Sequence, residues 1–292
     1  MTCRNLLMLP LLVVGIAIAQ TARAESPYKQ TEDVVFGDVD GVGLLMDIFT
    51  PTGASNGLGI VDVASGAFHS DRGKINDHKR AQMFDIFCGR GYTVFAVRPG
   101  SITKFSLAEM ASNLKKGILW VKAHADEYKI DPNRLGLTGA SAGGHLASLV
   151  AVTADDQSAV KAVGVFFPPT DFLDFRGTRI DANSSDSQLQ LVSKYVFPAG
   201  TKTGSAAEIV EKLKQISPAH NVTAKAPPFL IIHGDKDPLV PLSQSEKLLA
   251  ALQAAGVPAE LIVKKGGGHP WPTIHEEVQV IADWLDKQLA NK

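Results

Sequence analysis

The chain has 292 residues, of which 45% are hydrophobic and 20% are charged, and its formal net charge is −1. This composition is typical of a globular protein with one large α/β domain or two small ones. The charge is close to neutral and forms no basic stripe, so nothing in the sequence indicates nucleic-acid binding.

The N-terminus carries the pattern of an export signal. Arg4 precedes an apolar run over residues 6–19, which is shorter than the roughly 20 residues that span a bilayer. Ala22-Arg23-Ala24 then matches a small-x-small cleavage site, and Ala17-Ile18-Ala19 offers a second one. We expect a signal peptide over residues 1–24, a secreted or periplasmic mature protein and no stable membrane insertion after cleavage. An uncleaved anchor is the alternative.

Two cysteines occur in the chain. Cys3 leaves with the expected signal peptide, so Cys88 has no intramolecular partner in the mature protein. Cys88 lies at the apolar end of an expected helix, which favours a buried and unreactive thiol.

Short apolar strands alternate with amphipathic helices along the mature chain. The expected strands cover residues 33–39, 43–51, 59–64, 92–97, 134–139, 160–168, 228–234 and 259–265. The expected helices cover residues 79–91, 107–128, 143–154, 244–256 and 274–289. The first two strands are separated by Asp-Gly and predict a hairpin. The later alternation predicts a mostly parallel, eight-stranded sheet with helices on both faces.

The alternation stops between residues 169 and 226. This stretch is polar and irregular, and it contains one helical pattern over residues 206–216. We interpret it as an insertion or lid over one end of the sheet. No repeat or Pro/Ser-rich linker divides the chain, so we expect a single domain over residues 25–292.

Ser141 lies where an expected strand meets an expected helix, within Gly139-Ala140-Ser141-Ala142-Gly143. This is the G-x-S-x-G pattern, in which small residues permit a sharp and strained turn that exposes the serine hydroxyl. The N-terminus of the following helix directs N–H groups toward developing negative charge. The pattern therefore predicts a nucleophile, and the alternative is a serine that only caps the helix.

A serine nucleophile needs a base and an acid that orients the base. His269 follows the last expected strand, on a loop that begins with three glycines. Asp235 and Asp237 follow the preceding strand. The order Ser, Asp, His matches a catalytic triad on an α/β sheet, but chemistry alone leaves both aspartates open as the acid.

The chain resembles α/β-hydrolases of the acetyl esterase/lipase type, near the secreted acetyl- and feruloyl-esterases and the prolyl-oligopeptidase-like hydrolases. The segments that carry the resemblance are residues 128–151, around Ser141, and residues 217–261. The second segment contains the family pattern H-G-x-x-D-x-x-V-P. This match implies that Asp237 is the triad acid and that Asp235 stabilises its loop.

The chain departs from this group at the loop after the third strand. Such enzymes usually carry H-G-G-G-W, whose backbone amides help form the oxyanion hole, whereas this chain has Ala64-Ser65-Gly66-Ala67-Phe68. Backbone N–H groups do not depend on the side chain, so the hole can persist. We expect Gly66, Ala67 and Ala142 to supply the donors, with weaker activity or a narrower substrate range as a consequence of the changed loop.

Two further residues are candidates for the substrate site. Asp171 follows a strand end, where it either lines the site or caps a short helix. Trp271 lies beside His269, where it either lines the leaving-group side or packs in the core. The resemblance implies no metal and no organic cofactor, and the sequence contains no zinc-spaced Cys/His cluster, G-x-G-x-x-G or P-loop.

These residues predict a serine esterase for short-acyl esters, and the resemblance favours acetyl or feruloyl groups on polysaccharide or a small soluble ester. A prolyl-oligopeptidase-like peptidase stays open, although the chain lacks a large N-terminal propeller. A non-catalytic binding protein on a hydrolase scaffold also stays open, and the altered loop is its only support. A true lipase is disfavoured because no extended apolar lid segment is present. The oligomeric state is not predicted.

Overall fold

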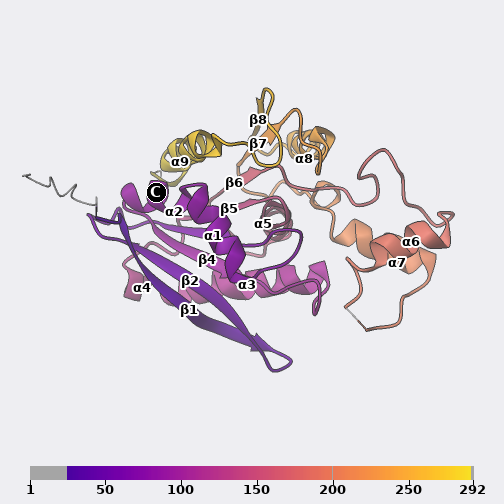
Figure 1. The fold of residues 1–292 in the computed structure, drawn as a ribbon, viewed down its shortest axis with the longest axis horizontal. Helices are drawn as coiled ribbons and strands as arrows, with labels where there is room; N and C mark the ends of the chain where they lie inside the picture. The colour runs from indigo at the N-terminus through magenta and orange to yellow at the C-terminus, as the bar shows by residue number, and fades with distance from the viewer. Residues whose placement is uncertain (1–24, 199, 291–292) are drawn as a thin grey trace, which may run out of the picture.

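The computed structural model describes residues 25–198 and 200–290, which form one eight-stranded sheet in the order β1-β2-β4-β3-β5-β6-β7-β8 (Figure 1). The strands are β1 (Tyr28–Val39), β2 (Val42–Pro51), β3 (Gly59–Val63), β4 (Thr93–Arg98), β5 (Leu135–Ala140), β6 (Ala162–Phe166), β7 (Phe229–Gly234) and β8 (Ala259–Lys264). The pairs β1–β2 and β2–β4 are antiparallel, and every other neighbouring pair is parallel. The predicted fold class, an α/β-hydrolase sheet, is confirmed.

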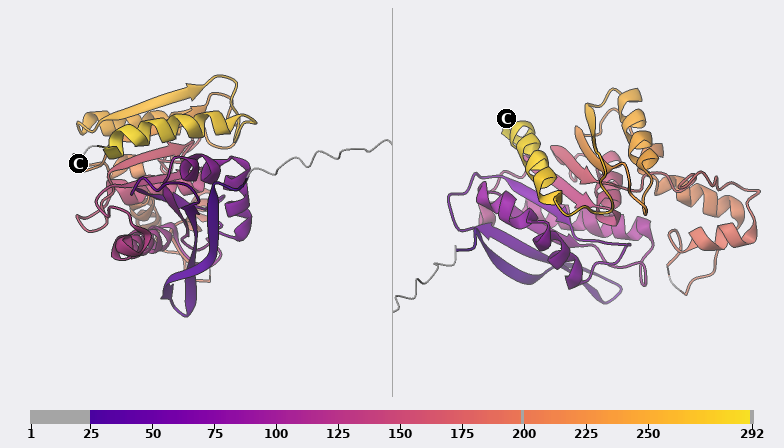
Figure 2. Two further views of the ribbon diagram at one scale, coloured as in Figure 1. Left: turned by 90° about the vertical axis from the view of Figure 1, so that its left-hand side faces the viewer. Right: turned by 45° about the horizontal axis from the view of Figure 1, so that its top comes forward.

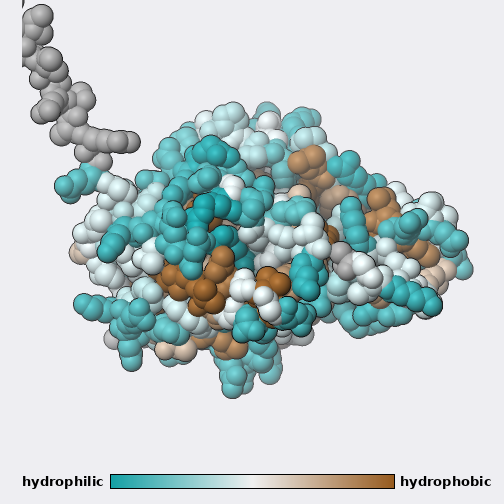
Figure 3. All heavy atoms as spheres, turned by 60° about the horizontal axis from the view of Figure 1, so that its bottom comes forward, coloured by the Kyte–Doolittle hydropathy of each residue, from teal (hydrophilic) through white to brown (hydrophobic). Residues whose placement is uncertain are grey.

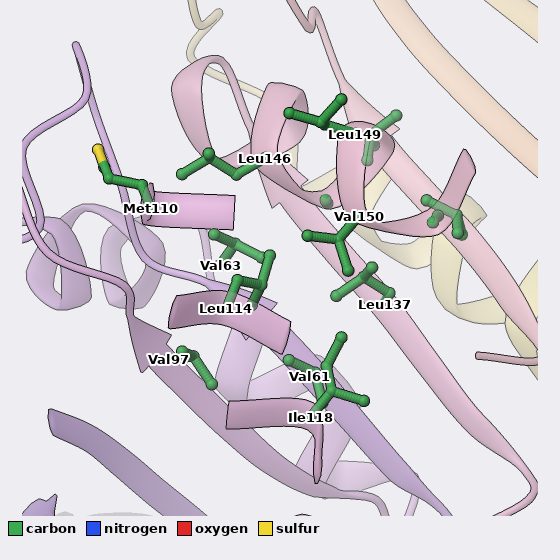
Figure 4. Close-up of a cluster of buried hydrophobic side chains, with 14 of the residues drawn as sticks. Val61, Val63, Val97, Met110, Leu114, Ile118, Leu137, Leu146, Leu149 and Val150 are labelled. Atoms are coloured by element: carbon green, nitrogen blue, oxygen red, sulfur yellow. The ribbon is translucent and has the colours of Figure 1, made fainter. Parts of the chain in front are cut away.

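Helices cover both faces of this sheet. They are α1 (Arg72–Arg80), α2 (Met83–Gly89), α3 (Leu107–Ala123), α4 (Ala125–Tyr128), α5 (Ala142–Val152), α6 (Asp186–Ser193), α7 (Ala206–Gln215), η1 (Pro218–His220), α8 (Leu242–Ala254) and α9 (Ile274–Ala290). One core lies between the sheet and α3, α5 and α8, and a second lies between the sheet and α1, α2 and α9. Figure 4 shows part of the first core, where side chains of α3 and α5 meet valines of β3 and β4 and Leu137 of β5. Parallel strands buried on both faces explain the nearly continuous apolar runs in the sequence.

The helix predicted over residues 79–91 is wrong in its boundaries. Two helices, α1 and α2, occupy this region, and Gln82 between them has a left-handed backbone with φ of 57°. The helix α1 starts earlier, at the N-cap Asp71, whose carboxylate accepts a hydrogen bond from the Gly73 N–H. The sequence of α1 is mostly polar and therefore shows no apolar helical periodicity.

The segment between residues 169 and 226 contains more structure than expected. It holds α6 as well as α7, and Figures 1 and 2 show both helices at one end of the molecule, beyond α8. Ser185 and Gln188 form a capping box at the start of α6, which is a sequence signal for a helix. The segment leaves the sheet where β6 finishes and returns to it at the start of β7.

The predicted signal peptide lies outside the described residues. Within residues 25–198 and 200–290, no helix combines the length and the apolar character needed to cross a bilayer. Figure 3 shows the face around β1, β2 and α3, on which polar side chains predominate and apolar side chains gather in separate patches.

Candidate active site

Ser141 occupies the sharp turn between β5 and α5, with φ of 54° and ψ of −120°. A left-handed backbone is costly for a residue with a Cβ, by about 1–3 kcal/mol, so the surrounding chain must hold it in place. The Ser141 N–H donates to the Phe166 carbonyl at 2.9 Å. A Cβ on Gly143 would lie 2.2 Å from the Val63 carbonyl oxygen, and one on Gly139 would lie 2.6 Å from the Gly143 backbone. Both glycines of the pattern are therefore required by close packing.

The structure brings the three predicted catalytic side chains together. His269 Nε2 lies 2.9 Å from Ser141 Oγ, and His269 Nδ1 lies 2.6 Å from Asp237 Oδ2. These residues are far apart in the chain and meet at the carboxyl ends of β5, β7 and β8. With Nδ1–H donating to Asp237, Nε2 is free to accept the serine proton, as a general base requires.

The carboxylate of Asp237 is buried and strongly held. Oδ1 accepts hydrogen bonds from the Leu239 and Val240 N–H groups at 2.8 and 2.9 Å. Burial raises the pKa of Asp237, but hydrogen bonds from His233, from His269 and from the backbone outweigh it and hold this pKa well below the usual value. Asp237 is therefore a stable anion that orients His269.

The acid loop and the histidine loop are locked to each other. A Cβ on Gly234 would lie 2.2 Å from the Gly267 carbonyl oxygen. Asp235 Oδ1 accepts a hydrogen bond from the Gly266 N–H at 2.7 Å, and the Lys236 N–H donates to the Gly267 carbonyl at 2.9 Å. Asp235 thus links the two loops, and the glycines before His269 permit close contact between two stretches of backbone.

The predicted oxyanion donors differ in availability. The Gly66 N–H donates to the His69 carbonyl at 2.9 Å, so the expectation that Gly66 is a free donor is wrong. In the described part of the chain, the N–H groups of Ala67 and Ala142 make no hydrogen bond, and both residues border the same pocket as Ser141. Ala67 and Phe68 have φ of 48° and 61°, so this loop takes a left-handed backbone without glycine at those two positions.

A pocket of about 750 Å³ opens above Ser141 and has two unlike walls. The apolar wall is contributed by the oxyanion loop, the insertion and the acid loop, and it comprises Phe68, Phe167, Pro169, Phe175, Leu239 and Val240. The polar wall is contributed by α1 and comprises Lys74, Asp77, His78 and Arg80. The site can therefore hold both an apolar group and a polar group next to the serine.

Trp271 lines the pocket and is also packed. Its side chain is 5% exposed, and its indole N–H donates to Glu277 Oε2 at 2.6 Å. Trp271 thus packs in the core and also borders the pocket. The Glu277 carboxylate also contacts Lys264 Nζ at 2.5 Å, which fixes the indole beside His269.

Asp171 does not line the pocket, which corrects the expectation for this residue. Its carboxylate faces α8 and η1, where it contacts Lys247 Nζ at 2.9 Å and His220 Nε2 at 2.9 Å. Burial raises the pKa of Asp171, but these two partners lower it overall. It also accepts a hydrogen bond from the Leu173 N–H at 3.0 Å, so it fastens the start of the insertion to the body of the protein.

The sequence analysis missed one residue pair at the pocket, Asp62 and His78. His78 Nδ1 lies 2.6 Å from Asp62 Oδ2, and both residues are buried. An aspartate inside the apolar strand of residues 59–64 was the available signal, because a buried carboxylate requires a partner. Within the described residues, no group of three or more His, Cys, Asp or Glu is arranged to hold a metal ion, and Cys88 is a buried free thiol whose pKa burial raises to about 12.

Comparison with known proteins places the chain among hydrolases. Residues 46–252 match the BD-FAE family. The probable carboxylic ester hydrolase LipM of Mycobacterium tuberculosis is 34% identical over 151 residues, which cover 48% of this chain and 33% of LipM. Esterase LipQ of the same organism is 32% identical over 154 residues, which cover 49% of this chain and 34% of LipQ. These matches span about a third of the length of each relative.

Solved structures share the fold. A truncated carbohydrate esterase from gut microbiota has a TM-score of 0.76 at 24% identity, and the match covers 92% of this chain and 99% of that one. The esterase Est2 of Thermogutta terrifontis has a TM-score of 0.67 at 23% identity, with 88% and 91% covered. The sheet, the strained serine turn and the family match agree, and the chain belongs to the BD-FAE family of α/β-hydrolases.

Proposed function

We propose that the protein is a serine carboxylesterase that hydrolyses short-acyl esters through an acyl-enzyme on Ser141. The observation that carries the proposal is the continuous hydrogen-bonded chain from Ser141 Oγ through His269 to Asp237, with spacings of 2.9 and 2.6 Å. The names of LipM and LipQ, a carboxylic ester hydrolase and an esterase, support it.

The geometry implies a two-step acyl transfer. Ser141 Oγ attacks the ester carbonyl while His269 Nε2 takes its proton, and Asp237 stabilises the imidazolium that forms. The N–H groups of Ala67 and Ala142 are the available donors for the oxyanion, where one donor typically contributes about 3 kcal/mol. His269 then protonates the departing alcohol, and a water molecule attacks the acyl-enzyme by the same route in reverse.

The class of substrate is supported by the names of structural neighbours and by the lining of the pocket. One structural neighbour is described as a carbohydrate esterase, and Est2 is described with butyrate bound. The pocket combines an apolar wall with a polar wall, which suits a short acyl group and a hydroxyl-rich alcohol. We therefore infer acetyl or feruloyl esters of a polysaccharide, or related small soluble esters, as substrates.

We further propose that residues 1–24 direct export and that residues 25–292 act as a single domain in a secreted or periplasmic location. The apolar run over residues 6–19, followed by Ala22-Arg23-Ala24, supports this proposal. N-terminal sequencing of protein recovered outside the cytoplasm tests it. A start at residue 25 is expected, and an intact residue 1 in the exported fraction would overturn the cleavage site.

A substrate panel with an active-site probe tests the reaction. A fluorophosphonate should label the native protein at Ser141, and Ser141→Ala should abolish labelling together with turnover of p-nitrophenyl acetate, butyrate and feruloyl esters. Failure of labelling and turnover would favour a non-catalytic binding protein. Faster turnover of a proline p-nitroanilide than of any ester would favour a peptidase.

A further inference from the structure

His78 sits in the polar wall of the pocket with its far nitrogen unpartnered. Its Nδ1 is held by Asp62 at 2.6 Å, whereas Nε2 makes no hydrogen bond in the part of the chain that the structure describes. The ring is 7% exposed, and the residue lines the same pocket as Ser141. A polar group on a ligand in the pocket is thus a natural partner for Nε2.

Asp62 makes His78 a donor. The Asp62 side chain is fully buried on β3, and its Oδ1 has no hydrogen-bond partner among the described residues. Burial lowers the pKa of His78, but the charge of Asp62 and its hydrogen bond raise it overall, with smaller effects from Asp77 and Lys74. The Asp62 contact thus favours the protonated ring, and a protonated ring donates from both nitrogens, so that Nε2–H is available to an acceptor on a ligand in the pocket.

Two more side chains that line the same pocket lack strong partners. Ser65 is 2% exposed and lines the pocket, and its Oγ is buried without a hydrogen-bond partner among the described residues. Lys74 lies over the oxyanion loop, because a Cβ on Gly66 would come within 2.9 Å of Lys74 Cδ. Its ammonium contacts Asp77 only at 3.6 Å, whereas Asp77 is paired more closely with Arg80.

We propose that Ser65, Lys74 and His78 form a subsite that binds a carboxylate carried by the ester substrate. The three side chains offer a cationic ammonium, an imidazole donor and a hydroxyl, and the one carboxylate in the lining of the pocket, Asp77, is paired with Arg80. A carboxylate accepts several hydrogen bonds and is the complement of such a donor set. This inference rests on the proposed esterase function, because it concerns the same pocket.

Matched pairs of probe esters test the subsite on both sides of the scissile bond. The alcohol side is tested by para-acetoxybenzoate against para-acetoxybenzamide. The acyl side is tested by the p-nitrophenyl monoester of adipic acid against the same ester of adipic acid monoamide. We expect kcat/KM to be about tenfold higher for the charged member in one pair, and that pair identifies the part of the substrate that carries the charge.

Salt provides a readout on the unmodified protein. The ratio of kcat/KM values, charged over neutral, should fall as sodium chloride rises from about 0.05 to 0.5 M, because screening weakens contacts between partly exposed charges. A ratio near one in both pairs at low salt would overturn the subsite while leaving the esterase function intact. Failure of the protein to hydrolyse any probe, p-nitrophenyl acetate included, would overturn the esterase proposal and the subsite with it.

Variants on α1 test which side chains cause the preference for the charged probe, measured as the ratio of kcat/KM values, charged over neutral. Lys74→Met and His78→Gln should bring the ratio close to one, and Lys74→Glu should bring it below one. The matched control is Lys79→Met on the same helix, because Lys79 contacts Gln30 and does not line the pocket. Retention of the preference in both Lys74→Met and His78→Gln would overturn the assignment, as would its loss in Lys79→Met.

Discussion

Two Asp–His pairs lie at the same pocket. The distance between aspartate and histidine is the same in both pairs, but the histidines differ in the partner of their second ring nitrogen. The Nδ1 to Oδ2 distance is 2.6 Å in both Asp237–His269 and Asp62–His78. His269 presents its other nitrogen to a serine hydroxyl at 2.9 Å, whereas the other nitrogen of His78 has no partner within the described chain. The comparison shows that contact with an aspartate does not by itself make a histidine a catalytic base. The group next to Nε2 decides the role, and at His269 this group is the hydroxyl of Ser141.

The two carboxylates also differ in how they are held. Asp237 receives hydrogen bonds from two backbone N–H groups, and His233 lies 3.4 Å from Oδ2. Asp62 has one buried oxygen without a partner among the described residues, and its other oxygen contacts His78. The pKa of Asp237 is lowered, so Asp237 stays an anion that holds His269 in position to exchange a proton with Ser141.

The largest expected effect comes from removing either the nucleophile Ser141 or the base His269. Ser141→Ala or His269→Ala should lower kcat for p-nitrophenyl acetate by about a millionfold, since both act as one unit. Thermal melting should show an intact fold. Turnover within a hundredfold of the native value in either variant would mean that the pair is not catalytic.

The next effect separates the two aspartates of the acid loop. Asp237→Asn should lower kcat by about ten-thousandfold, because the amide disfavours the required tautomer of His269. Asp235→Asn is the matched control two residues away, because the amide oxygen can still accept the hydrogen bond from the Gly266 N–H. We expect a far smaller loss there, and an equal loss in both variants would contradict the assignment of the acid.

The third-largest effect is expected from the contact between the acid loop and the histidine loop. Gly234→Ala should lower kcat about a hundredfold, as displacement of a catalytic group by about 1 Å can do, and should destabilise the fold by about 1–3 kcal/mol. Gly268→Ala is the control, since a Cβ there would meet only the Pro270 carbonyl at 3.5 Å. Chemical unfolding together with kcat distinguishes the two, and equal behaviour would refute the role of the contact.

The smallest expected effect is a pH-dependent difference in stability between the native protein and a variant of the Asp62–His78 pair. The pKa of His78 is raised in the folded protein, from a usual value of 6.5, so its contribution is complete below about pH 6.5. It is lost as the pH rises through the raised value. The melting temperature of Asp62→Asn should therefore fall below the native one by about 2–4 °C near pH 6, and the gap should narrow toward pH 9. A gap independent of pH would contradict a protonated His78.

Much of the catalytic arrangement could be predicted because the motifs encode close packing. Gly139 and Gly143 are required by backbone contacts at 2.6 and 2.2 Å, so their presence around Ser141 was informative. The mostly parallel sheet with helices on both faces followed from the alternation of apolar runs and helices, whereas the order of its strands came from the structure. The choice of Asp237 over Asp235 came from resemblance, and the structure supplies the reason, since Asp235 faces Gly266.

The errors arose where tertiary contacts decide. The Gly66 N–H is used by the His69 carbonyl, a bridge within a loop whose left-handed backbone at Ala67 and Phe68 is not indicated by glycine at those positions. Asp171 found Lys247 and His220, which come from distant parts of the chain. The helix α1 and its residue His78 were missed because mostly polar sequence carries little periodic signal, although Asp62 in an apolar strand required a partner.

The interlocked loops of Asp237 and His269 have a consequence for how this site tolerates motion. Gly234 and Gly267 are in backbone contact, and Asp235 and Lys236 add hydrogen bonds across the same seam. We therefore expect acid and base to move together relative to the serine turn, which is anchored separately on Phe166. If the sheet fluctuates, we expect the distance between Ser141 and His269 to lengthen before the distance between His269 and Asp237 does.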